Sequence, residues 1–259
     1  MNLHKHKKSL GQNFLTDTYI QRKIIEACDL KNSDVVVEIG PGQGVLTRLI
    51  APHVQRLISI ETDKDLIESL RAEFEQKNDI IHADFLKWDM NELPQDIKII
   101  GNIPYYISTP IIEKLIYERK KISQAFLTVQ LEFGQRLIAQ PGGKDYGSLT
   151  GYAQYYADIK MLFKIKNTCF KPAPRVDSCF ISLTFKSNRE KSAENEEFLF
   201  KLIQTAFQQR RKNIVNTLKG LVGKDRLEGA LKELNIDLNA RPENLTLSNY
   251  IDLSNKLVI

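Results

Sequence analysis

Long apolar runs, paired cysteines and clustered histidines are missing from this sequence of 259 residues, and each absence excludes a class of protein. No run approaches the roughly 20 apolar residues that span a bilayer, and the N-terminus has no apolar signal segment. We therefore expect a cytoplasmic protein without a membrane contact. The three cysteines form no C-x-x-C pair and the four histidines lack the spacing of metal ligands, so we predict neither a disulfide framework nor a metal site.

The composition that is present is that of a globular protein with a basic surplus. Hydrophobic residues make up 42% and charged residues 27% of the chain, which argues against disorder and against a fibrous fold. Domains mostly run from about 50 to 250 residues, so the length allows one sizeable domain and a smaller appendage. The net charge of +5 favours a polyanionic partner.

The stretch VVVEIGPGQGVLT, residues 35–47, predicts a buried strand, a tight turn and the start of a helix. Glycines in the turn allow positive φ angles and let a ligand approach backbone N–H groups. They are Gly40, Gly42 and Gly44. The third glycine of the dinucleotide fingerprint would fall at Val45, so that fingerprint is absent. The pattern E-x-G-P-G-x-G, which begins at Glu38, is similar instead to the loop of class I S-adenosylmethionine-dependent methyltransferases. An ordinary strand-to-helix connection and a site for another nucleotide are the alternatives.

Acidic residues follow the next two predicted strands. Residues 57–60 predict a strand that ends at Glu61, and residues 80–82 predict another with Asp84 just beyond its end. In open α/β sheets the ligand contacts lie at the carboxyl ends of strands. Glu61 follows the glycines by about 20 residues, where a carboxylate can hold a ribose diol, and Asp84 could accept a hydrogen bond from an adenine amino group. Capping and packing are the alternative, because acids after strands are common.

A fourth predicted strand, residues 97–100, leads into NIPYYIST, which suits methylation of an exocyclic amine. Such an amine on adenine is a poor nucleophile because its lone pair is delocalised, and two acceptors for its protons would favour a more pyramidal nitrogen. Asn102 offers a side-chain carbonyl, and Pro104 forces Ile103 into an extended conformation that can present its backbone carbonyl. Tyr105 supplies an aromatic face for an extruded base. A β-turn that uses Asn and Pro for backbone reasons is the alternative.

Aromatic and basic residues elsewhere are candidates for contact with nucleic acid. Phe170 could stack on the other face of the extruded adenine, with a core position as the alternative. Phosphate contacts are expected from cations in the N-terminal tail, in the proline-rich loop after Phe170 and in the helical C-terminal part, although a frayed tail and a solvated helix face are the alternatives. These cations are Lys7, Lys8, Lys171, Arg175, Arg210, Arg211 and Lys212.

A polar stretch at residues 187–196 divides the chain. Before it, strands near 125–129, 161–165 and 178–185 are expected to complete a mixed sheet. After it the pattern is helical to the end of the sequence. We therefore predict a catalytic domain at residues 1–186, with an N-terminal extension that contacts cofactor or RNA, and a helical RNA-docking domain at residues 187–259.

Taken together and in order, the motifs resemble those of the rRNA adenine N6,N6-dimethyltransferases, most closely the small-subunit or KsgA type. The motifs are KKSLGQNFL, VEIGPGQGVLT, IETD, ADFL, NIPYYIST, FKPAPRVDS and FQQRRKNIVNTLK. The resemblance covers nearly the whole chain. It implies an α/β fold with the Rossmann-like sheet of class I S-adenosylmethionine-dependent methyltransferases and a small C-terminal all-helical domain.

The resemblance also implies the reaction and its site. Two adjacent adenosines near the 3′ end of small-subunit (16S) rRNA would become N6,N6-dimethyladenosine, which links the protein to ribosome biogenesis and to a pre-30S particle. S-adenosyl-L-methionine would donate the methyl groups and leave as S-adenosyl-L-homocysteine, and a monomer is expected. The donor would lie across the three glycines, with its ribose at Glu61 and its adenine at Asp84. Further contacts would come from Gln12, Asn13, Leu15 and Asn102.

Other functions stay open at this point. A resistance-type dimethyltransferase of a 23S rRNA adenine is the nearest enzyme alternative, and FKPAPRVDS followed by FQQRRKNIVNTLK favours the small-subunit type. A ribosome-assembly or transcription factor could keep the fold without catalysis, although the intact motifs argue against that loss. A DNA adenine methyltransferase would need a further recognition domain. Ala83 and Tyr106 depart from residues common in the family, with open consequences.

Overall fold

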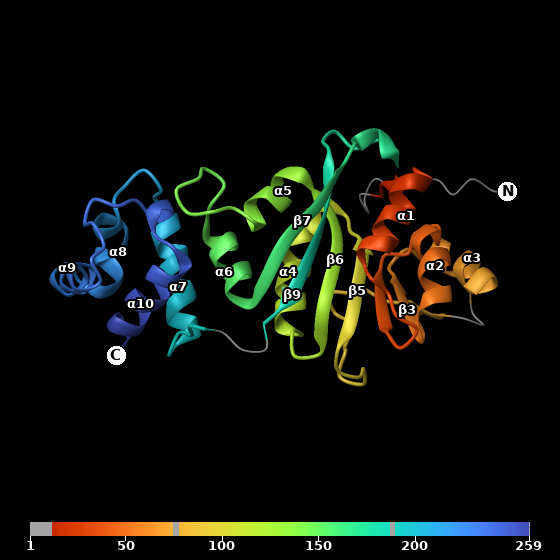
Figure 1. Cartoon of the computed structure of the whole chain (residues 1–259), viewed down its shortest axis with the longest axis horizontal. Coiled ribbons are helices and arrows are strands. Elements are labelled where there is room, and N and C mark those ends of the chain that lie inside the picture. The colour runs from red at the N-terminus through yellow and green to blue at the C-terminus, as the bar shows by residue number, and fades with distance from the viewer. Residues whose placement is uncertain (1–11, 75–77, 187–189, 259) are drawn as a thin grey trace. The chain divides into compact units, whose positions relative to one another are not determined.

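The computed structural model describes residues 12–74, 78–186 and 190–258. Its contacts divide the chain into two compact units. The first unit comprises residues 1–134 and 158–185, and the second comprises residues 135–157 and 186–259. Figure 1 shows the order of the elements along the chain. Each unit is described below by itself.

A seven-stranded sheet forms the centre of the first unit. Neighbouring strands from β4 to β6 run parallel, and β9 runs antiparallel to β6. The strands in their order across the sheet are β4 (Asp79–His82), β3 (Arg56–Glu61), β2 (Val35–Ile39), β5 (Ile97–Asn102), β6 (Ile122–Gln130), β9 (Ser178–Phe185) and β7 (Ala157–Ile165). The central strands are rich in β-branched residues, which suits strands buried on both faces. The predicted α/β class with a mixed sheet is confirmed.

Helices lie before, between and after the parallel strands in the chain. They are α1 (Thr18–Ala27), α2 (Val45–Ile50) with the 3₁₀ turn η2 (Ala51–His53), α3 (Lys64–Phe74), η3 (Tyr105–Ile107) with α4 (Ser108–Tyr117), and α5 (Leu131–Leu137). Asp17 caps α1, since its carboxylate accepts the Ile20 N–H at 3.0 Å. Ile24 of α1 and Ile50 of α2 pack on the central strands in one apolar cluster. Leu70 and Phe74 of α3 pack with Ile80 in a second one.

The segment that follows the basic N-terminal tail is held in place by a distant part of the chain. β1 (Phe14–Leu15) pairs antiparallel with β8 (Phe170–Lys171), which follows η4 (Asn167–Cys169). The Thr16 N–H donates to the Cys169 carbonyl at 2.8 Å. Residues 12–16 are therefore fixed against the sheet domain at the side where the central strands end.

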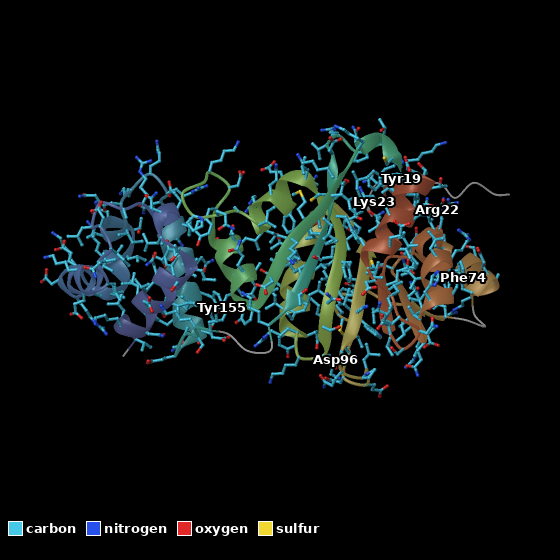
Figure 2. All side chains as sticks on the ribbon, in the orientation of Figure 1. Tyr19, Arg22, Lys23, Phe74, Asp96 and Tyr155 are labelled. Atoms are coloured by element: carbon cyan, nitrogen blue, oxygen red, sulfur yellow. The ribbon has the colours of Figure 1, made fainter. Side chains whose placement is uncertain are left out.

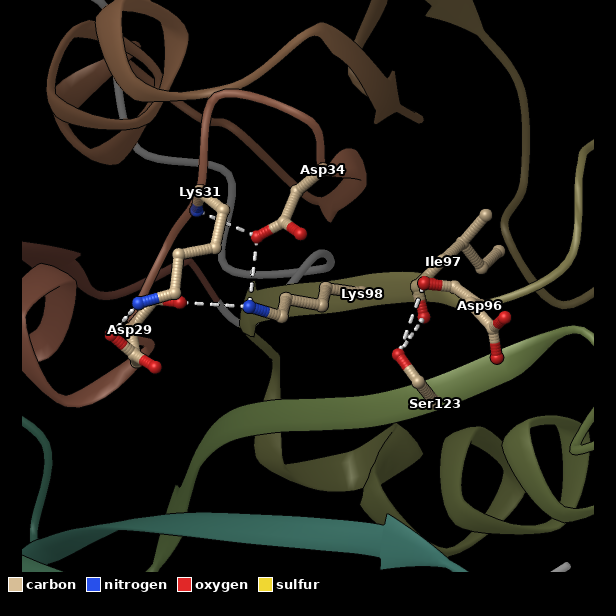
Figure 3. Close-up of polar contacts among 7 residues, drawn as sticks. All are labelled: Asp29, Lys31, Asp34, Asp96, Ile97, Lys98 and Ser123. Atoms are coloured by element: carbon tan, nitrogen blue, oxygen red, sulfur yellow. Dashed lines mark hydrogen bonds and ion pairs between the residues drawn. The ribbon is translucent and has the colours of Figure 1, made fainter.

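A polar cluster ties the opposite end of the strands to α1 (Figure 3). The Lys98 ammonium, at the start of β5, donates to the Asp34 carboxylate and to the Asp29 carbonyl, each at 2.8 Å. The Lys31 N–H donates to the same Asp34 oxygen at 2.8 Å. Ser123 Oγ donates to the Asp96 carbonyl at 3.0 Å. The turns that precede β2 and β5 are fixed by these bonds.

The second unit is helical. It holds α6 (Ser148–Tyr156), α7 (Glu196–Phe207), α8 (Ile214–Val222), α9 (Lys224–Glu233), η5 (Pro242–Asn244) and α10 (Leu247–Leu257). The Glu196 carboxylate accepts hydrogen bonds from the hydroxyls of Tyr155, labelled in Figure 2, and Tyr156, at 3.2 and 2.6 Å. Phe200 packs against both tyrosine rings. The contacts thus group residues 135–157 with the C-terminal helices, whereas the sequence assigned them to the first domain. The division into domains at residue 186 stays a prediction.

Candidate active site

A cavity of about 320 Å³ lies in the first unit at the carboxyl ends of its parallel strands. Its wall is built by the N-terminal segment, the turn after β2, the end of β3, the residues after β4 and the turn after β5. Most of the predicted cofactor and acceptor residues meet here. They are Gln12, Asn13, Leu15, Gly40, Gly42, Glu61, Asp84, Asn102, Ile103, Pro104 and Tyr105.

The glycines serve different purposes. All three have positive φ angles, of 65° at Gly40, 58° at Gly42 and 73° at Gly44. A Cβ on Gly42 would lie 2.8 Å from the ring of Phe14, which itself lines the cavity. Gly44 precedes α2 and does not line the cavity. A Cβ there would lie 2.5 Å from the ring of Phe74. Phe74, at the end of α3, is labelled in Figure 2. Gly40 and Gly42 therefore leave room in the wall, whereas Gly44 allows α3 to pack against the turn.

Glu61 ties the turn after β2 to the end of β3. Its two oxygens accept the N–H groups of Gly42 at 3.0 Å and Asp63 at 2.8 Å. Burial raises the pKa of this carboxyl, and the backbone donors oppose that rise. A carboxylate has about four acceptor positions, so both oxygens can accept further hydrogen bonds from a ligand. A ribose diol fits that pattern.

Asp84 stands two residues beyond β4, in a half-buried turn. One carboxylate oxygen accepts the Leu86 N–H at 3.0 Å, and this bond fixes the direction of the side chain. Phe85 and Leu86 line the cavity next to it. An acceptor between apolar side chains is suited to the amino edge of an adenine ring.

Asn102 is the last residue of β5, and its side-chain orientation is fixed. Its Nδ2 donates to the Asn13 carbonyl at 3.1 Å. Since the amide nitrogen faces the N-terminal segment, Oδ1 is left as the acceptor of the same side chain. Gln12 anchors that segment further, because its Nε2 donates to the Asp63 carboxylate at 2.7 Å. The N-terminal segment thereby connects both ends of the cavity.

The turn after Asn102 presents an aromatic ring. Pro104 has φ −60° and ψ 134°, which places Tyr105 at the start of η3. The Tyr105 hydroxyl makes a 2.6 Å hydrogen bond with Ser178 Oγ at the start of β9. Burial raises the pKa of Tyr105, while the bond to Ser178 opposes the rise. The next residue, Tyr106, is 63% exposed.

Glu38 lines the cavity, although the sequence assigned it only to the loop pattern. Its side chain is 2% exposed, and Oε2 accepts hydrogen bonds from Thr47 Oγ1 at 2.7 Å and Ser59 Oγ at 2.8 Å. Burial raises the pKa of the Glu38 carboxyl to about 7. The sequence signal that could have marked Glu38 as a site residue is an acid within a strand of buried β-branched residues. The hydroxyl partners are remote in sequence.

Phe170 lies outside the cavity wall. It is 4% exposed and packs with Leu15, Ile24 and Phe180 in the apolar cluster, because β8 pairs with β1 and directs the ring into the core. The structure thus places Phe170 in the core position that was the alternative. Its predicted stacking on adenine finds no geometric support.

The predicted phosphate contacts are only partly described. Lys171, Arg175, Arg211 and Lys212 are exposed. Arg210 donates to the Lys144 carbonyl at 2.8 Å within the second unit. Lys7 and Lys8 lie outside the described residues.

Metal sites and membrane spans are both absent from the described ranges. No group of three or more His, Cys, Asp or Glu side chains there could hold a metal ion. No helix among the described residues is long and apolar enough to cross a membrane.

The sequence matches known proteins along nearly its whole length. The family model for ribosomal RNA adenine dimethylase matches residues 3–258. A curated relative from Fusobacterium nucleatum, named ribosomal RNA small subunit methyltransferase A, is 41% identical over 255 residues, which cover 96% of each chain. The relative of that name from Geobacillus thermodenitrificans is 39% identical over 266 residues, covering 97% of this chain and 91% of the relative.

Solved structures agree in fold. A dimethyladenosine transferase from Plasmodium falciparum aligns with a TM-score of 0.80 at 25% identity, covering 93% of this chain and 95% of the other. The 23S rRNA methyltransferase ErmE aligns with a TM-score of 0.75 at 27% identity, covering 95% and 99%. The similarity extends through both units.

Proposed function

The chain belongs to the ribosomal RNA adenine dimethylase family, and we propose that it methylates N6 of two adjacent adenosines near the 3′ end of small-subunit rRNA. The observation that carries the proposal is the convergence of the Gly40–Gly42 turn, Glu61, Asp84 and Asn102 on one cavity. The small-subunit assignment is supported by the names of relatives that cover both units of the chain.

The cavity offers S-adenosyl-L-methionine a glycine-lined wall and carboxylate acceptors. A Cβ at Gly42 would occupy the space before Phe14, so the glycine keeps a cradle open in the wall. Glu61 would accept the ribose hydroxyls, and Asp84 the adenine amino group. When bound, the cofactor supplies an electrophilic methyl group and leaves as S-adenosyl-L-homocysteine. We expect no metal in this reaction.

The residues after β5 would orient the acceptor. Asn102 Oδ1 and the Ile103 carbonyl accept hydrogen bonds from the adenine amino group, and Tyr105 stacks on the base. Since Asn102 Nδ2 is bound to the Asn13 carbonyl at 3.1 Å, its amide cannot turn without breaking a hydrogen bond. The amine loses one proton to solvent for each methyl group that it gains. The cycle repeats until the nitrogen is dimethylated.

Replacement of Asn102 by Ala tests this mechanism. We expect methyl transfer to RNA to fall by about 100-fold or more, as when an enzyme loses a preorganised hydrogen-bonding group. Calorimetric affinity for S-adenosyl-L-methionine should stay close to that of the unchanged protein. Near wild-type transfer of labelled methyl groups by Asn102→Ala would refute the assigned role.

The identity of the RNA is tested by mapping. Labelled methyl groups are located after reaction with pre-30S particles, naked 16S rRNA and 23S rRNA in parallel. We expect dimethylation of adjacent adenosines near the 3′ end of 16S rRNA, by a cytoplasmic monomer. Methylation of 23S rRNA alone would instead support a 23S rRNA methyltransferase, the activity for which ErmE is named. Failure to bind the cofactor in calorimetry would support a non-catalytic assembly factor.

A further inference from the structure

We propose that Ser178 is a positioning residue for the acceptor base, because its hydroxyl holds the Tyr105 ring in one orientation at the cavity. The inference rests on the proposed function, since it requires a base that stacks on Tyr105. The sequence placed Ser178 at the end of the motif FKPAPRVDS and at the start of the strand expected at residues 178–185. Its hydrogen bond with Tyr105 supports a role in positioning the base.

The hydrogen bond joins two segments that are 73 residues apart in sequence. Tyr105 Oη and Ser178 Oγ lie 2.6 Å apart, and Ser178 is fully buried. The Tyr105 ring is half-buried and lines the cavity. A tyrosine fixed at both its backbone and its hydroxyl cannot swing about its side-chain torsions. The ring therefore offers the same face before the base arrives.

Ser178 can serve as an anchor because its own position is fixed. It pairs with Gln130 at the edge between β9 and β6. The preceding residue, Asp177, accepts the Asn167 N–H at 3.0 Å and the Lys166 ammonium at 2.9 Å. The Asp177 carbonyl accepts the Leu131 N–H at 3.0 Å. These bonds close the base of the loop that carries Lys171 and Arg175.

The alternative is a hydroxyl that only satisfies a buried tyrosine. Loss of the bond would then lower stability without a specific effect on the acceptor base. The two roles predict different methyl-transfer rates for the single and double variants. A positioning role acts through a single bond, so removing either partner should have the same effect on methyl transfer as removing both.

A double-mutant cycle with Ser178→Ala and Tyr105→Phe tests the proposal. The measurements are the single-turnover rate of methyl transfer to 16S rRNA, the cofactor affinity by calorimetry and the free energy of unfolding in urea. RNA with 2-aminopurine at the target position adds a fluorescence signal that depends on stacking. Ser182→Ala, on the same strand and 8% exposed, is the matched control.

We expect each single variant and the double variant to transfer methyl groups about three- to tenfold more slowly, by a common factor, with the same change in 2-aminopurine fluorescence. Cofactor affinity should be unchanged, and Ser182→Ala should have no effect on the rate. Multiplicative loss in the double variant, or a Ser178→Ala variant with an unchanged rate and fluorescence, would overturn the proposal. If the unchanged protein methylates no rRNA, the proposed function fails, and the role of Ser178 falls with it even where unfolding shows the coupling.

Discussion

At the scale of single residues, Glu38 makes the stability of the free protein depend on pH. Its folded pKa is raised from 4.5 to about 7, so between these values the folded chain binds a proton that the unfolded chain has lost. The stabilisation is complete below pH 4.5 and disappears as the pH rises through 7. The hydrogen bonds from Thr47 and Ser59 lower the pKa of Glu38, but burial outweighs them.

Glu38→Gln should remove this pH dependence. Relative to the variant, the unchanged protein should lose roughly 3 kcal/mol of unfolding free energy between pH 4.5 and 7, at about 1.4 kcal/mol per pKa unit. Urea unfolding at several pH values measures the difference. The Glu61 pKa is also raised and contributes with the same sign. Because the Glu61 charge is a minor cause of the Glu38 shift, a small part of the difference belongs to the pair. Parallel curves for the two proteins would contradict the assignment to Glu38.

Gly42→Ala separates backbone strain from obstruction of the cavity. Gly42 has φ 58° and would direct a Cβ at Phe14, whereas Gly142 has φ 87° and no atom within 4 Å of the position that a Cβ would take. Both alanine variants should be destabilised by about 1 kcal/mol, the cost of a left-handed conformation. Only Gly42→Ala should weaken the binding of S-adenosyl-L-methionine, by about tenfold or 1.4 kcal/mol. Calorimetry distinguishes them, and equal affinities would show that Phe14 yields freely.

At the scale of elements, the cluster in Figure 3 joins α1 to the start of β2 and β5. Lys98 and Asp34 are 12% and 17% exposed, whereas the pair Lys31–Asp29 is 59% and 79% exposed. Partly buried pairs leave an uncompensated charge when one partner is lost, but exposed pairs contribute little. The Lys98–Asp34 pair should therefore contribute to the free energy of unfolding, and the exposed Lys31–Asp29 pair in the same cluster should contribute little.

Lys98→Met should lower the free energy of unfolding by about 2 kcal/mol, and Lys31→Met by less than about 0.5 kcal/mol. Cofactor affinity should not change in either variant, since the cluster lies at the end of the strands away from the cavity. Chemical denaturation measures the first effect and calorimetry the second. An equal loss in both variants would show that burial does not decide the contribution.

Elements with a local signal could be predicted from the sequence, and those that depend on remote partners could not. The strand before Gly40 and the helix that begins after Gly44 follow from neighbouring residues. No local feature of the sequence shows whether the Phe170 ring stacks on a base or packs in the core. The structure pairs Phe170 with Leu15, and the ring packs in the apolar cluster. The grouping of residues 135–157 with α7 depends likewise on the bonds of Tyr155 and Tyr156 to Glu196.

The candidate site shows the same division. Its acids and its NIPY turn could be found because each follows a predicted strand, and parallel strands bring their carboxyl ends together. The bonds from Asn102 to Asn13 and from Tyr105 to Ser178 could not be found, because they join segments that are 89 and 73 residues apart. The sequence therefore predicts candidate reacting groups, and the fold shows the contacts that orient their side chains.

At the scale of the whole molecule, the basic surplus should appear as salt dependence of RNA binding. Arg211 and Lys212 are exposed, and each phosphate contact releases counterions. Arg211→Ala and Lys212→Ala should each reduce the slope of log affinity against log salt by about 0.7, the value for single-stranded nucleic acid. Lys232→Ala, also exposed but distant in sequence, is the control. Unchanged slopes in the first two variants would exclude phosphate contact there.

The pairing of β1 with β8 also bears on the order in which the protein becomes complete during synthesis. Thr16 and Cys169 are 153 residues apart, so the segment that emerges first from the ribosome waits for one that emerges much later. Until then residues 14–15 lack their partner strand, although the bonds of Gln12 to Asp63 and of Asn13 to Asn102 join residues that have already been made. A nascent chain that ends before residue 169 therefore contains the predicted donor contacts but lacks β8 and Ser178. We expect competence for methyl transfer late in synthesis, after both have been made.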